Sequence, residues 1–586
     1  MPETATQSQA TKDFLALARK RFQLAADAEA DTRKLCLEDL KFSVGDQWPE
    51  EIKIGRGRKV TLTMDQIQQS INQVSNEYRQ QRPATNVAPV GNDSDEDTAE
   101  IFQGAIRHIE VRSDAEIAYD NAHDHTVRTG FGSYRFLTEY TDNDGNQEIL
   151  IAPIRNQFGV YWQPGVSQDK ATWCFLISDI PVEEYDDALD TDNTDAGRMN
   201  SKSLVEFSSE GDAQQEWITK EYIRVAEYFT VEEIAEKGKK TKRKVTWHKI
   251  NAVEELEKPR NLPGSSIPIF TCTGYDIEVD GKRYLAGLVR NVKDAQRQYN
   301  YMVSAATEAI ALAPKAPFIM ADGQAEGYEK MWENANTDTY STLFYKPFAV
   351  NGTPLPPPQR QQSEPPIQAM TVMINQARMD LRASTGLYDP SLGQNKGDES
   401  GKAIQSLQKQ GDVATLNYSD NMARTMRRAG NVLIDWIRHY YDAPRIQRII
   451  KPDGSVSQVV IHNGADQADQ AQALLTDKIK KIYDIGVGDY DIVIDVGPNF
   501  KTKREQAVSS QLEFLKLLPP QVAVNYTDLV AGNMDWPQAK EFAARAKKML
   551  PPQLQDQDDG DPEAKLQQMQ QVNAHLAQQH QLLEKA

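Results

Sequence analysis

The amino-acid sequence predicts an α+β protein made of several lobes. Its 586 residues exceed the size at which a single hydrophobic core usually stops growing. Apolar residues recur at helical spacing before Pro83 and again after Gly287, whereas the region 131–280 alternates with a period of two. Helices and strands therefore dominate different parts of the chain, which is the pattern of an α+β fold.

The first eighty residues predict two helices. One helical pattern covers residues 11–42. A second helix ends before Pro83, and its apolar face carries Ile67, Ile71, Val74 and Tyr78.

A third helix is predicted between Ser113, a possible N-cap, and Gly130, at a typical C-terminal position. It contains His123, Asp124 and His125, and two histidines around a carboxylate invite comparison with a metal or catalytic site. On a helix, side chains two residues apart point about 200° apart, so the two histidines cannot bind one ion together. We therefore predict a structural role for them and no metal site.

The region 131–280 is predicted to be a β-rich lobe. Its alternating stretches include YRFLTEY, QEILIAPI, KATWCFLISDI, EYIRVAEYF and RKVTWHKI. The acidic segment 186–214 has few large apolar residues and is predicted to be a mobile loop without chemistry. The basic run KGKKTKRK, at 237–244, could contact nucleic acid, but its place beside a strand favours a solvated hairpin loop.

Two helices with narrow apolar seams follow. Spacings alternating between four and three predict a seam close to that of a coiled coil on the first helix, formed by Leu288, Val292, Ala295, Tyr299, Met302, Ala306 and Ala309. Pro314 and Pro317 end this helix, and a compact insertion separates it from the next. The seam of the second helix is formed by Ile367, Met370, Ile374, Ala377 and Leu381.

The remainder of the chain mixes long helices with a little β-structure. A glycine-rich polar loop leads into about forty residues of helical pattern, followed by a hairpin pattern at 449–463 and the strand YDIVIDV. Helices are predicted from about 503 to 548, then a linker. The last predicted helix is rich in glutamine and has a narrow stripe of apolar residues, which suggests self-association.

The composition excludes several classes of protein. Asp and Glu outnumber Lys and Arg by 85 to 66, a formal charge of −19, so any contact with DNA must be local. Cys36, Cys174 and Cys272 form no CxxC pair, which indicates neither a zinc site nor a disulfide framework and suits a reducing cytosol. The polar N-terminus and the lack of a long uncharged run predict neither export nor membrane insertion.

The sequence GDESGKA, residues 397–403, resembles a phosphate-binding loop without matching it. Its glycines are one residue too close together, and Ala403 stands where a magnesium-binding hydroxyl is required. Motifs of serine hydrolases and zinc proteases are also missing from the sequence. We predict that the protein is not an enzyme and needs no cofactor.

Several stretches together resemble the portal proteins of tailed double-stranded DNA bacteriophages, in particular the branch found in short-tailed phages of enteric bacteria. They occur in order as GDQW (45–48), LTMDQIQQSINQVSNEYRQQRPATNVAP (62–89), GFGSYRF, VYWQPGVSQD (160–169), GYDIEVDGKRYLAGLVRNVKDAQRQYNYMVSAATEAIALAPKAPFI (274–319), MWENAN (331–336), SGKAIQSLQKQG (400–411) and GDYDIVIDVGPNFKTKREQA (488–507). The family usually has an aspartate before Pro164, where this chain has Gln163. Large members also carry a longer C-terminal helix, so a tall barrel is not expected here.

The resemblance implies a ring subunit with a β-rich wing, paired stem helices, a small clip, a long tunnel helix and a helical crown. The wing is expected at 1–286, with a helical start and a β-rich part at 131–280, and returns at 442–504 as a β-hairpin and a strand. The other expected regions are a stem helix at 287–313, the clip at 314–365, a second stem helix at 366–388, the tunnel loop at 389–401, the tunnel helix at 402–441, the crown at 505–548, a linker at 549–562 and a short C-terminal helix at 563–586.

The implied function is a dodecameric ring at one capsid vertex of the virion, assembled in the host cytoplasm. Double-stranded DNA would pass through its channel during packaging and ejection, without sequence specificity. Terminase, major capsid and scaffolding proteins, and tail adaptor or head-completion proteins are the implied partners. The alternative is a non-enzymatic scaffold or coiled-coil assembly protein of a virion, which would explain the seams but not the β-rich lobe.

Two sets of residues are expected to carry this function. Those nearest DNA, in the tunnel loop and the helix after it, are Gln394, Asn395, Lys396, Lys402 and Lys409. Those at the subunit interface, on the stem seams, are Val292, Tyr299, Met302, Met370 and Ile374. Sparse basic groups suit a channel, because each gripped phosphate adds salt-dependent affinity and a broadly basic wall would hold the duplex.

Overall fold

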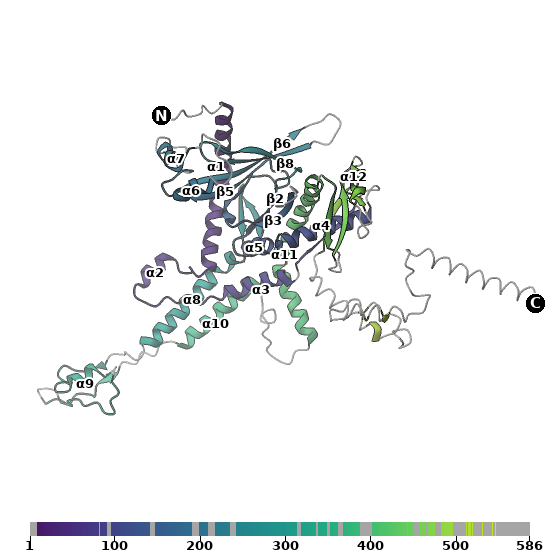
Figure 1. Cartoon of the computed structure of the whole chain (residues 1–586). Coiled ribbons are helices and arrows are strands. Elements are labelled where there is room, and N and C mark those ends of the chain that lie inside the picture. Colours follow the sequence, from purple (N-terminus) through teal and green to yellow (C-terminus); the bar gives the residue numbers. More distant parts are fainter. Residues whose placement is uncertain are drawn as a thin grey trace, which may run out of the picture. The chain divides into compact units, whose positions relative to one another are not determined.

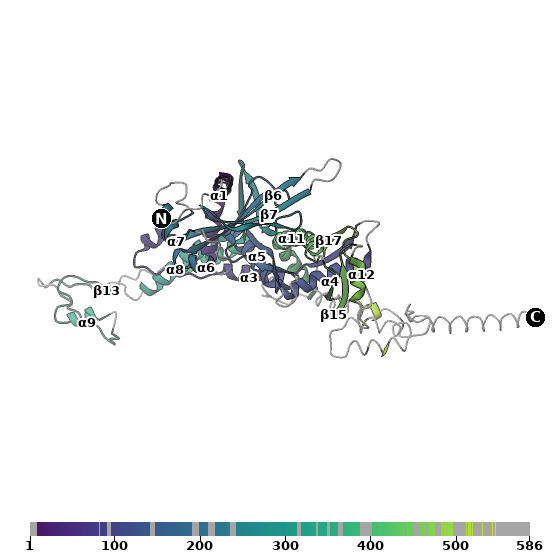
Figure 2. The ribbon, with the colours of Figure 1, turned by 45° about the horizontal axis from the view of Figure 1, so that its top comes forward.

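A computed structural model of the chain divides into two units, Met1–Val496 and Gly497–Ala586. Helices α1 to α12 and strands β1 to β17 belong to the first unit (Figures 1 and 2). The structure describes residues 9–495 except 81, 91–94, 141–146, 190–198, 209–216, 235–241, 313–317, 336–337, 349–351, 361–366, 387–400, 442, 451–455, 465–466, 475–481, and beyond them only 511, 514–516, 519, 530, 542 and 545–546.

The chain begins with five helices and one short strand. They are α1 (Gln9–Ser43), α2 (Glu50–Arg56), α3 (Ile67–Gln80), β1 (Ala84–Pro89), α4 (Glu96–Arg112) and α5 (Ala115–Thr129). Helix α5 ends at Gly130 as predicted, in left-handed backbone with φ 101°. The predicted start at Ser113 is wrong, because Ser113 caps the C-terminus of α4 and Asp114 precedes α5.

The larger sheet is antiparallel and has the strand order β4-β5-β6-β7-β8. Its strands are β4 (Val160–Trp162), β5 (Trp173–Pro181), β6 (Tyr222–Ile234), β7 (Lys242–Ile250) and β8 (Glu255–Leu262). Helix α1 packs on one face, where Phe22 makes edge-to-face contacts with Phe175 and Trp217. A period-two pattern thus buries one row of side chains under a helix.

Two short helices overlap the acidic segment 186–214, which the sequence predicted to be a loop. They are α6 (Val182–Leu189) and α7 (Ser201–Ser208). Asp186 of α6 accepts hydrogen bonds from the backbone N–H and the hydroxyl of Ser201, at 2.8 and 2.7 Å, and Tyr185 and Leu204 are buried against the sheet. The loop prediction is wrong for residues 186–189 and 201–208, because the hydrogen bonds of Asp186 and the burial of neighbouring side chains outweigh the polar composition.

The central core lies around a three-stranded sheet of order β3-β2-β9. These strands are β2 (Phe131–Tyr140), β3 (Gln147–Pro153), after which the short helix η1 (Gln157–Gly159) follows, and β9 (Ile269–Thr273). Helices α4, α5 and α11 (Gly401–Tyr440) cover it with buried side chains such as Phe102, Tyr119 and Trp436. Parts of the chain far apart in sequence therefore share one core.

The remaining strands form small sheets. Strands β10 (Tyr275–Val279) and β11 (Lys282–Ala286) make a hairpin, and β14 (Arg445–Ile450), β15 (Val456–His462) and β16 (Ile482–Asp484) make a three-stranded sheet followed in sequence by β17 (Tyr490–Asp495). Helix α12 (Ala468–Ala473) lies between β15 and β16 in the chain. Strand β17 pairs with β1, which joins the last strand of the unit to the first.

Two long helices frame a small lobe in the sequence. Helix α8 (Leu288–Leu312) precedes the lobe and α10 (Ile367–Thr385) follows it. Between them the structure has β12 (Phe318–Ile319), α9 (Glu329–Glu333) and β13 (Gln359–Arg360).

Candidate functional site

Helices α8 and α10 lie side by side and share a core with α3 (Figure 1). Val292 has no exposed surface and Tyr299 is 5% exposed, because Ile71, Ala377 and Leu381 of the same chain surround the seam. Burial inside one chain leaves Val292 no surface, and Tyr299 almost none, to offer to a neighbouring subunit. The expectation of a subunit contact is therefore wrong for Val292 and Tyr299.

The other seam residues and the opposite face of α10 differ in exposure. Met302, Met370 and Ile374 are half-buried. On the side of α10 away from α8, Val372 and Met379 are 67% and 63% exposed, and they lie seven residues apart, on one stripe. Apolar side chains this exposed on a long helix are available for contact with another surface.

Residues 60–66, called the strap below, run along α8 outside any helix or strand. Gln296, Asn300 and Ser304 project from one buried face of the helix, four residues apart. Their side-chain oxygens accept, in that order, the backbone N–H groups of Gln66 (3.2 Å), Met64 (2.9 Å) and Leu62 (2.9 Å). The spacing matches because four helical residues rise about 6 Å and two extended residues about 6.6 Å.

The GDQW motif belongs to the same arrangement. Asn300 donates from its side-chain nitrogen to the Gln47 side-chain oxygen at 2.7 Å, and the Trp48 indole N–H donates to the Leu62 carbonyl at 3.2 Å. Arg56 donates to the Val60 carbonyl. Hydrogen bonds therefore hold the strap from α8 on one side and from Trp48 and Arg56 on the other. The bond between Asn300 and Gln47 links α8 to the segment that follows α1.

A buried carboxylate makes a second link between α1 and α8. Asp39 is fully buried, and its oxygens lie 2.7 Å from Arg290 and 2.6 Å from Lys293. Glu38 contacts Lys293 and Arg297 nearer the surface. A buried charge that lost these partners would be strongly destabilising, so this cluster specifies how the two helices dock.

Close backbone contacts link the start of α8 to α5, and α5 to strand β2 of the central sheet. A side chain at Gly132 would place its Cβ 1.9 Å from the carbonyl oxygen of Ala122, and one at Gly287 would lie 2.4 Å from that of Val127. Gly130 has a positive φ and also lacks room for a Cβ. Glycine at these positions lets α5, β2 and the start of α8 approach one another more closely than any side chain would allow.

The two histidines of α5 occupy different environments. His123 stacks on Tyr78 with ring centroids 4.1 Å apart, and burial lowers the pKa of His123 to about 4. His125 donates from Nδ1 to the Phe131 carbonyl at 2.5 Å, and burial lowers its pKa as well. Both rings take part in packing.

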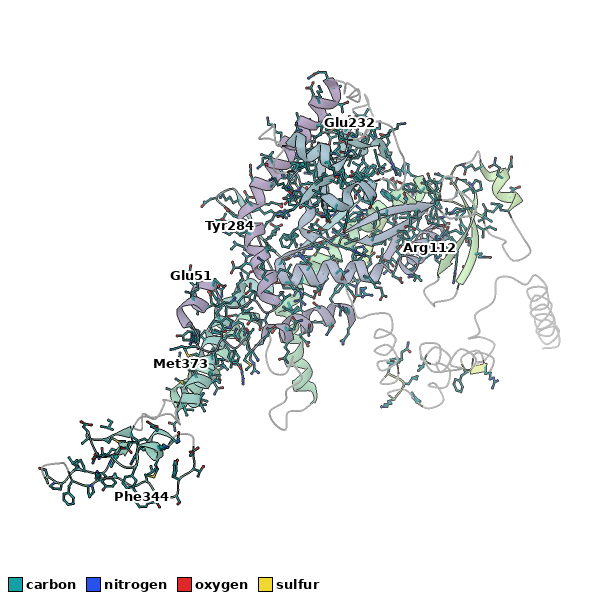
Figure 3. All side chains as sticks on the ribbon, turned by 60° about the vertical axis from the view of Figure 1, so that its left-hand side comes forward. Glu51, Arg112, Glu232, Tyr284, Phe344 and Met373 are labelled. Carbon is teal, nitrogen blue, oxygen red and sulfur yellow. The ribbon has the colours of Figure 1, made fainter. Side chains whose placement is uncertain are left out.

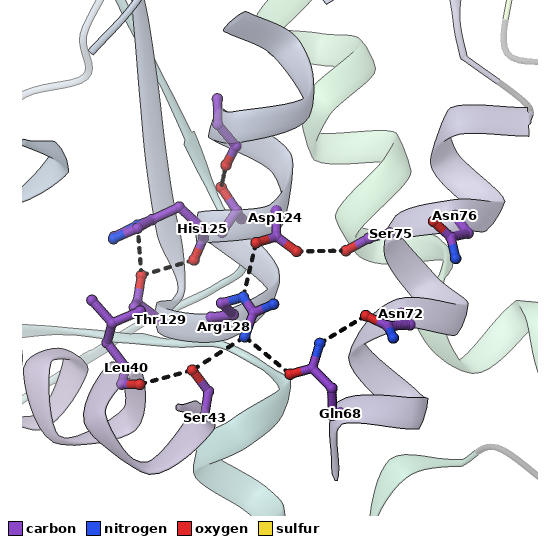
Figure 4. A network of polar contacts seen from close by, with 12 residues as sticks. Leu40, Ser43, Gln68, Asn72, Ser75, Asn76, Asp124, His125, Arg128 and Thr129 are labelled. Carbon is purple, nitrogen blue, oxygen red and sulfur yellow. Dashed lines mark hydrogen bonds and ion pairs between the residues drawn. The ribbon is translucent and has the colours of Figure 1, made fainter. Parts of the chain in front are cut away.

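Asp124, between the histidines, belongs to a polar network that joins three helices (Figure 4). It accepts from Ser75 of α3 at 3.0 Å and from Arg128 at 2.8 Å. Arg128 also donates to Ser43 of α1 at 3.3 Å and to Gln68 of α3 at 3.4 Å. No local sequence pattern marks this network, because its members come from three separate helices.

Gln163 stands where the resemblance leads us to expect an aspartate before Pro164. Its side-chain oxygen accepts both the backbone N–H and the hydroxyl of Thr172, at 2.8 and 2.9 Å. A carboxylate oxygen would accept the same bonds, so the change removes a charge and keeps the acceptor. Nearby, Gln168 bonds both the N–H and the carbonyl of Thr271 and so covers the open edge of β9.

The residues expected near DNA are only partly within the described structure. Gln394, Asn395 and Lys396 lie outside the described residues, as do most of the crown and all of the short C-terminal helix. Lys402 and Lys409 lie in the first turns of α11, where the backbone alone is described. Sequence analysis overlooked a further basic group on α11, although the letters MARTMRR show it: Arg424, Arg427 and Arg428, of which the first two are exposed.

Within the described ranges, no group of three or more His, Cys, Asp or Glu side chains could hold a metal ion. No helix in the part of the chain that the structure describes is long and apolar enough to cross a membrane.

Comparison with known proteins identifies the class to which this chain is similar, the phage portal proteins, and the mixed helical and β-sheet fold is consistent with that class. A family model described as phage P22-like portal protein matches residues 19–586. A portal protein of Acyrthosiphon pisum secondary endosymbiont phage 1 is 24% identical over 594 residues, covering 91% of this chain and 80% of that protein. The chain belongs to the P22-like portal protein family. This family is structural, and it implies an oligomeric ring within the virion.

Proposed function

We propose that twelve copies of this chain form a ring at one capsid vertex, and that double-stranded DNA passes through its central channel during packaging and ejection. The observation that supports this most is the family match over residues 19–586. The ring would also dock the terminase motor and the tail or head-completion proteins. Its assembly in the host cytoplasm is part of the same proposal.

We assign the regions of the ring by the elements of the chain. Helices α8 and α10 are the stem, 314–365 is the clip, 389–401 is the tunnel loop with α11 behind it, and 505–548 is the crown. The packing of α8 against α10 supports the stem assignment. The flanking sheets, with the N-terminal helices, are the wing.

We place the subunit contact of the stem on exposed and half-buried residues of α8 and α10. Val372 and Met379 form an outward apolar stripe on α10, and the half-buried Met302, Met370 and Ile374 lie where a neighbour could complete the packing. Burial of such a stripe against the next subunit would be favourable at about 25 cal/mol per Å² of apolar surface.

Contact with DNA is assigned to the tunnel loop and the start of α11. Lys396, Lys402 and Lys409 would meet phosphates, and Gln394 and Asn395 would flank them. The overall acidic charge supports sparse contacts that let the duplex slide. Deleting residues 394–397 should leave rings intact and reduce the DNA packaged or retained per particle.

Negative-stain microscopy of the purified protein tests the proposal directly. Views down the axis should show a closed ring with a hollow centre, and a single compact particle would refute the portal function. The double variant Val372→Asp and Met379→Asp should abolish rings, because charge would enter a packed interface at a cost of several kcal/mol per subunit. Its thermal unfolding as a single chain should match wild type.

A matched control variant introduces two aspartates at similarly exposed apolar positions outside the stem. Val111 and Ile117 are 65% and 56% exposed on α4 and α5. The variant Val111→Asp and Ile117→Asp should form rings normally. Rings in the α10 variant, with a folded single chain, would remove that stripe from the interface.

A further inference from the structure

A cavity of about 380 Å³, called the Glu110 cavity below, lies between α4, α5, α11 and the segment that leads into β1. Its lining reaches from solvent to the core, because the Glu116 side chain is 78% exposed whereas Tyr119 and Met426 are buried. Glu110 lines the cavity from the last turn of α4, two residues before Arg112, which Figure 3 labels. The cavity therefore connects a carboxyl group at the edge of the central core with the surface.

Glu110 is half-buried, and its carboxyl group accepts a hydrogen bond from the Tyr119 hydroxyl at 3.2 Å. Burial raises the pKa of Glu110 from an ordinary 4.5 to about 7, because a charged carboxylate is poorly hydrated there. The Tyr119 hydrogen bond and the charges of Arg107 and Arg82 favour the ionised form, but they do not offset the lost hydration. Glu110 therefore changes its charge around neutral pH.

The other titratable and charged groups that face Glu110 come from several elements. Burial raises the pKa of each tyrosine among them above its ordinary value, so the tyrosine hydroxyls stay neutral. The arginines keep their charge, and the other two carboxylates are exposed to solvent. The set consists of Arg107 of α4, Asp114, Glu116 and Tyr119 of α5 and the turn before it, Arg82 before β1, Tyr78 of α3 and Tyr134 of β2.

Arg82 holds the start of β1 against α5 beside the Glu110 cavity. Its guanidinium lies 3.0 Å from a Glu116 oxygen and 2.7 Å from an Asp120 oxygen. Two residues further on, Ala84 begins β1 and pairs with Asp495, the last residue of β17. The two ion pairs of Arg82 therefore act on the end of the β1–β17 ladder that leads out of the first unit of the chain.

We propose that Glu110 and Arg82 form a proton-controlled latch: the cavity stays closed while Glu110 is neutral, and opens by separation of Arg82 and β1 from α5 when Glu110 loses its proton to solvent. Opening hydrates the carboxylate, which is unfavourable in the closed cavity. Ionised Glu110 also competes for Arg82 with Glu116, whose pair is weak because solvent screens it. The latch lies within one chain, so it does not depend on the proposed ring.

Hydrogen exchange of the full-length protein, followed by mass spectrometry, tests the latch. Opening returns the pKa of Glu110 to its ordinary 4.5, so the open state loses the proton first, and opening becomes easier as the pH rises from 4.5 to 7. Between pH 5 and pH 8 the opening equilibrium constant should rise roughly fiftyfold. After correction for the intrinsic effect of pH on exchange, peptides covering residues 82–89 should show this rise, and peptides from β6 should not.

Three variants identify the groups responsible. Glu110→Gln should remain closed at both pH values, because its side chain cannot ionise, and Arg82→Gln should exchange faster than wild type at residues 84–89 already at pH 5. Glu100→Gln, which changes an exposed carboxylate on the same helix, should behave like wild type. The latch is overturned if residues 82–89 of the wild type exchange alike at both pH values, or if the rise persists in Glu110→Gln. Equal exchange of Arg82→Gln and wild type at pH 5 would also overturn it.

Discussion

Replacing Gly132 by alanine should destabilise the protein far more than the change of one methyl group suggests. The new Cβ would lie 1.9 Å from the Ala122 carbonyl oxygen and 2.8 Å from the Thr126 hydroxyl. To reach an ordinary contact, β2 and α5 must separate by more than about 1 Å, yet β2 is hydrogen-bonded on both sides, to β3 and β9. Overpacking usually costs about 1 to 3 kcal/mol, and a clash between the backbone of α5 and a strand held on both sides places this variant at about 3 kcal/mol or more.

Two control variants separate the clash from other effects of adding a methyl group. A Cβ added at Gly55, in α2, would have no other atom within 4 Å, and the backbone there has an ordinary φ, so Gly55→Ala should be neutral or stabilising by roughly 0.5 to 1 kcal/mol. Gly165 also has free space but a φ of 73°, so Gly165→Ala should cost only the left-handed strain of about 1 to 2 kcal/mol. The assay is urea unfolding followed by circular dichroism. If Gly132→Ala unfolds at the same urea concentration as Gly165→Ala, or above it, the close approach of β2 and α5 is refuted.

Three further predictions concern buried polar groups and the near-match to a phosphate loop. Asn300→Leu should cost about 2 to 6 kcal/mol, because the Met64 N–H and the Gln47 amide lose their partner, and hydrogen exchange at Met64 should accelerate; unchanged exchange would exclude the strap contact. The pKa of His123 is about 4 in the folded protein and 6.5 normally, so the unfolded state takes up the proton first and stability falls as the pH drops from 6.5 to 4. The loss should be roughly 3 kcal/mol larger in wild type than in His123→Phe, measured by urea unfolding at several pH values, and equal losses would contradict the buried neutral ring. The purified protein should not bind ATP in equilibrium dialysis, because Ala403 cannot hold magnesium; saturable binding abolished by Lys402→Ala would revive an enzymatic function.

The sequence itself was sufficient to predict the mixed fold and the family. Helical and strand periods depend on which side chains face a core, and this is a local property of the chain. The seam of α8 and the end of α5 at Gly130 follow from such local signals. The portal resemblance rested on motifs in a defined order, and the family match over residues 19–586 confirmed it.

Only the tertiary structure showed which segment covers each buried face of a helix. Val292 was expected to meet another subunit, but α3 and α10 of the same chain bury it, and periodicity cannot distinguish these two neighbours. Asn300 lies with Gln296 and Ser304 on a buried polar stripe beside the seam of α8, and its partner Met64 is 236 residues away in the chain. Spacing within a segment reports that a face is buried or polar, whereas the identity of its partner depends on contacts between segments that the linear order does not contain.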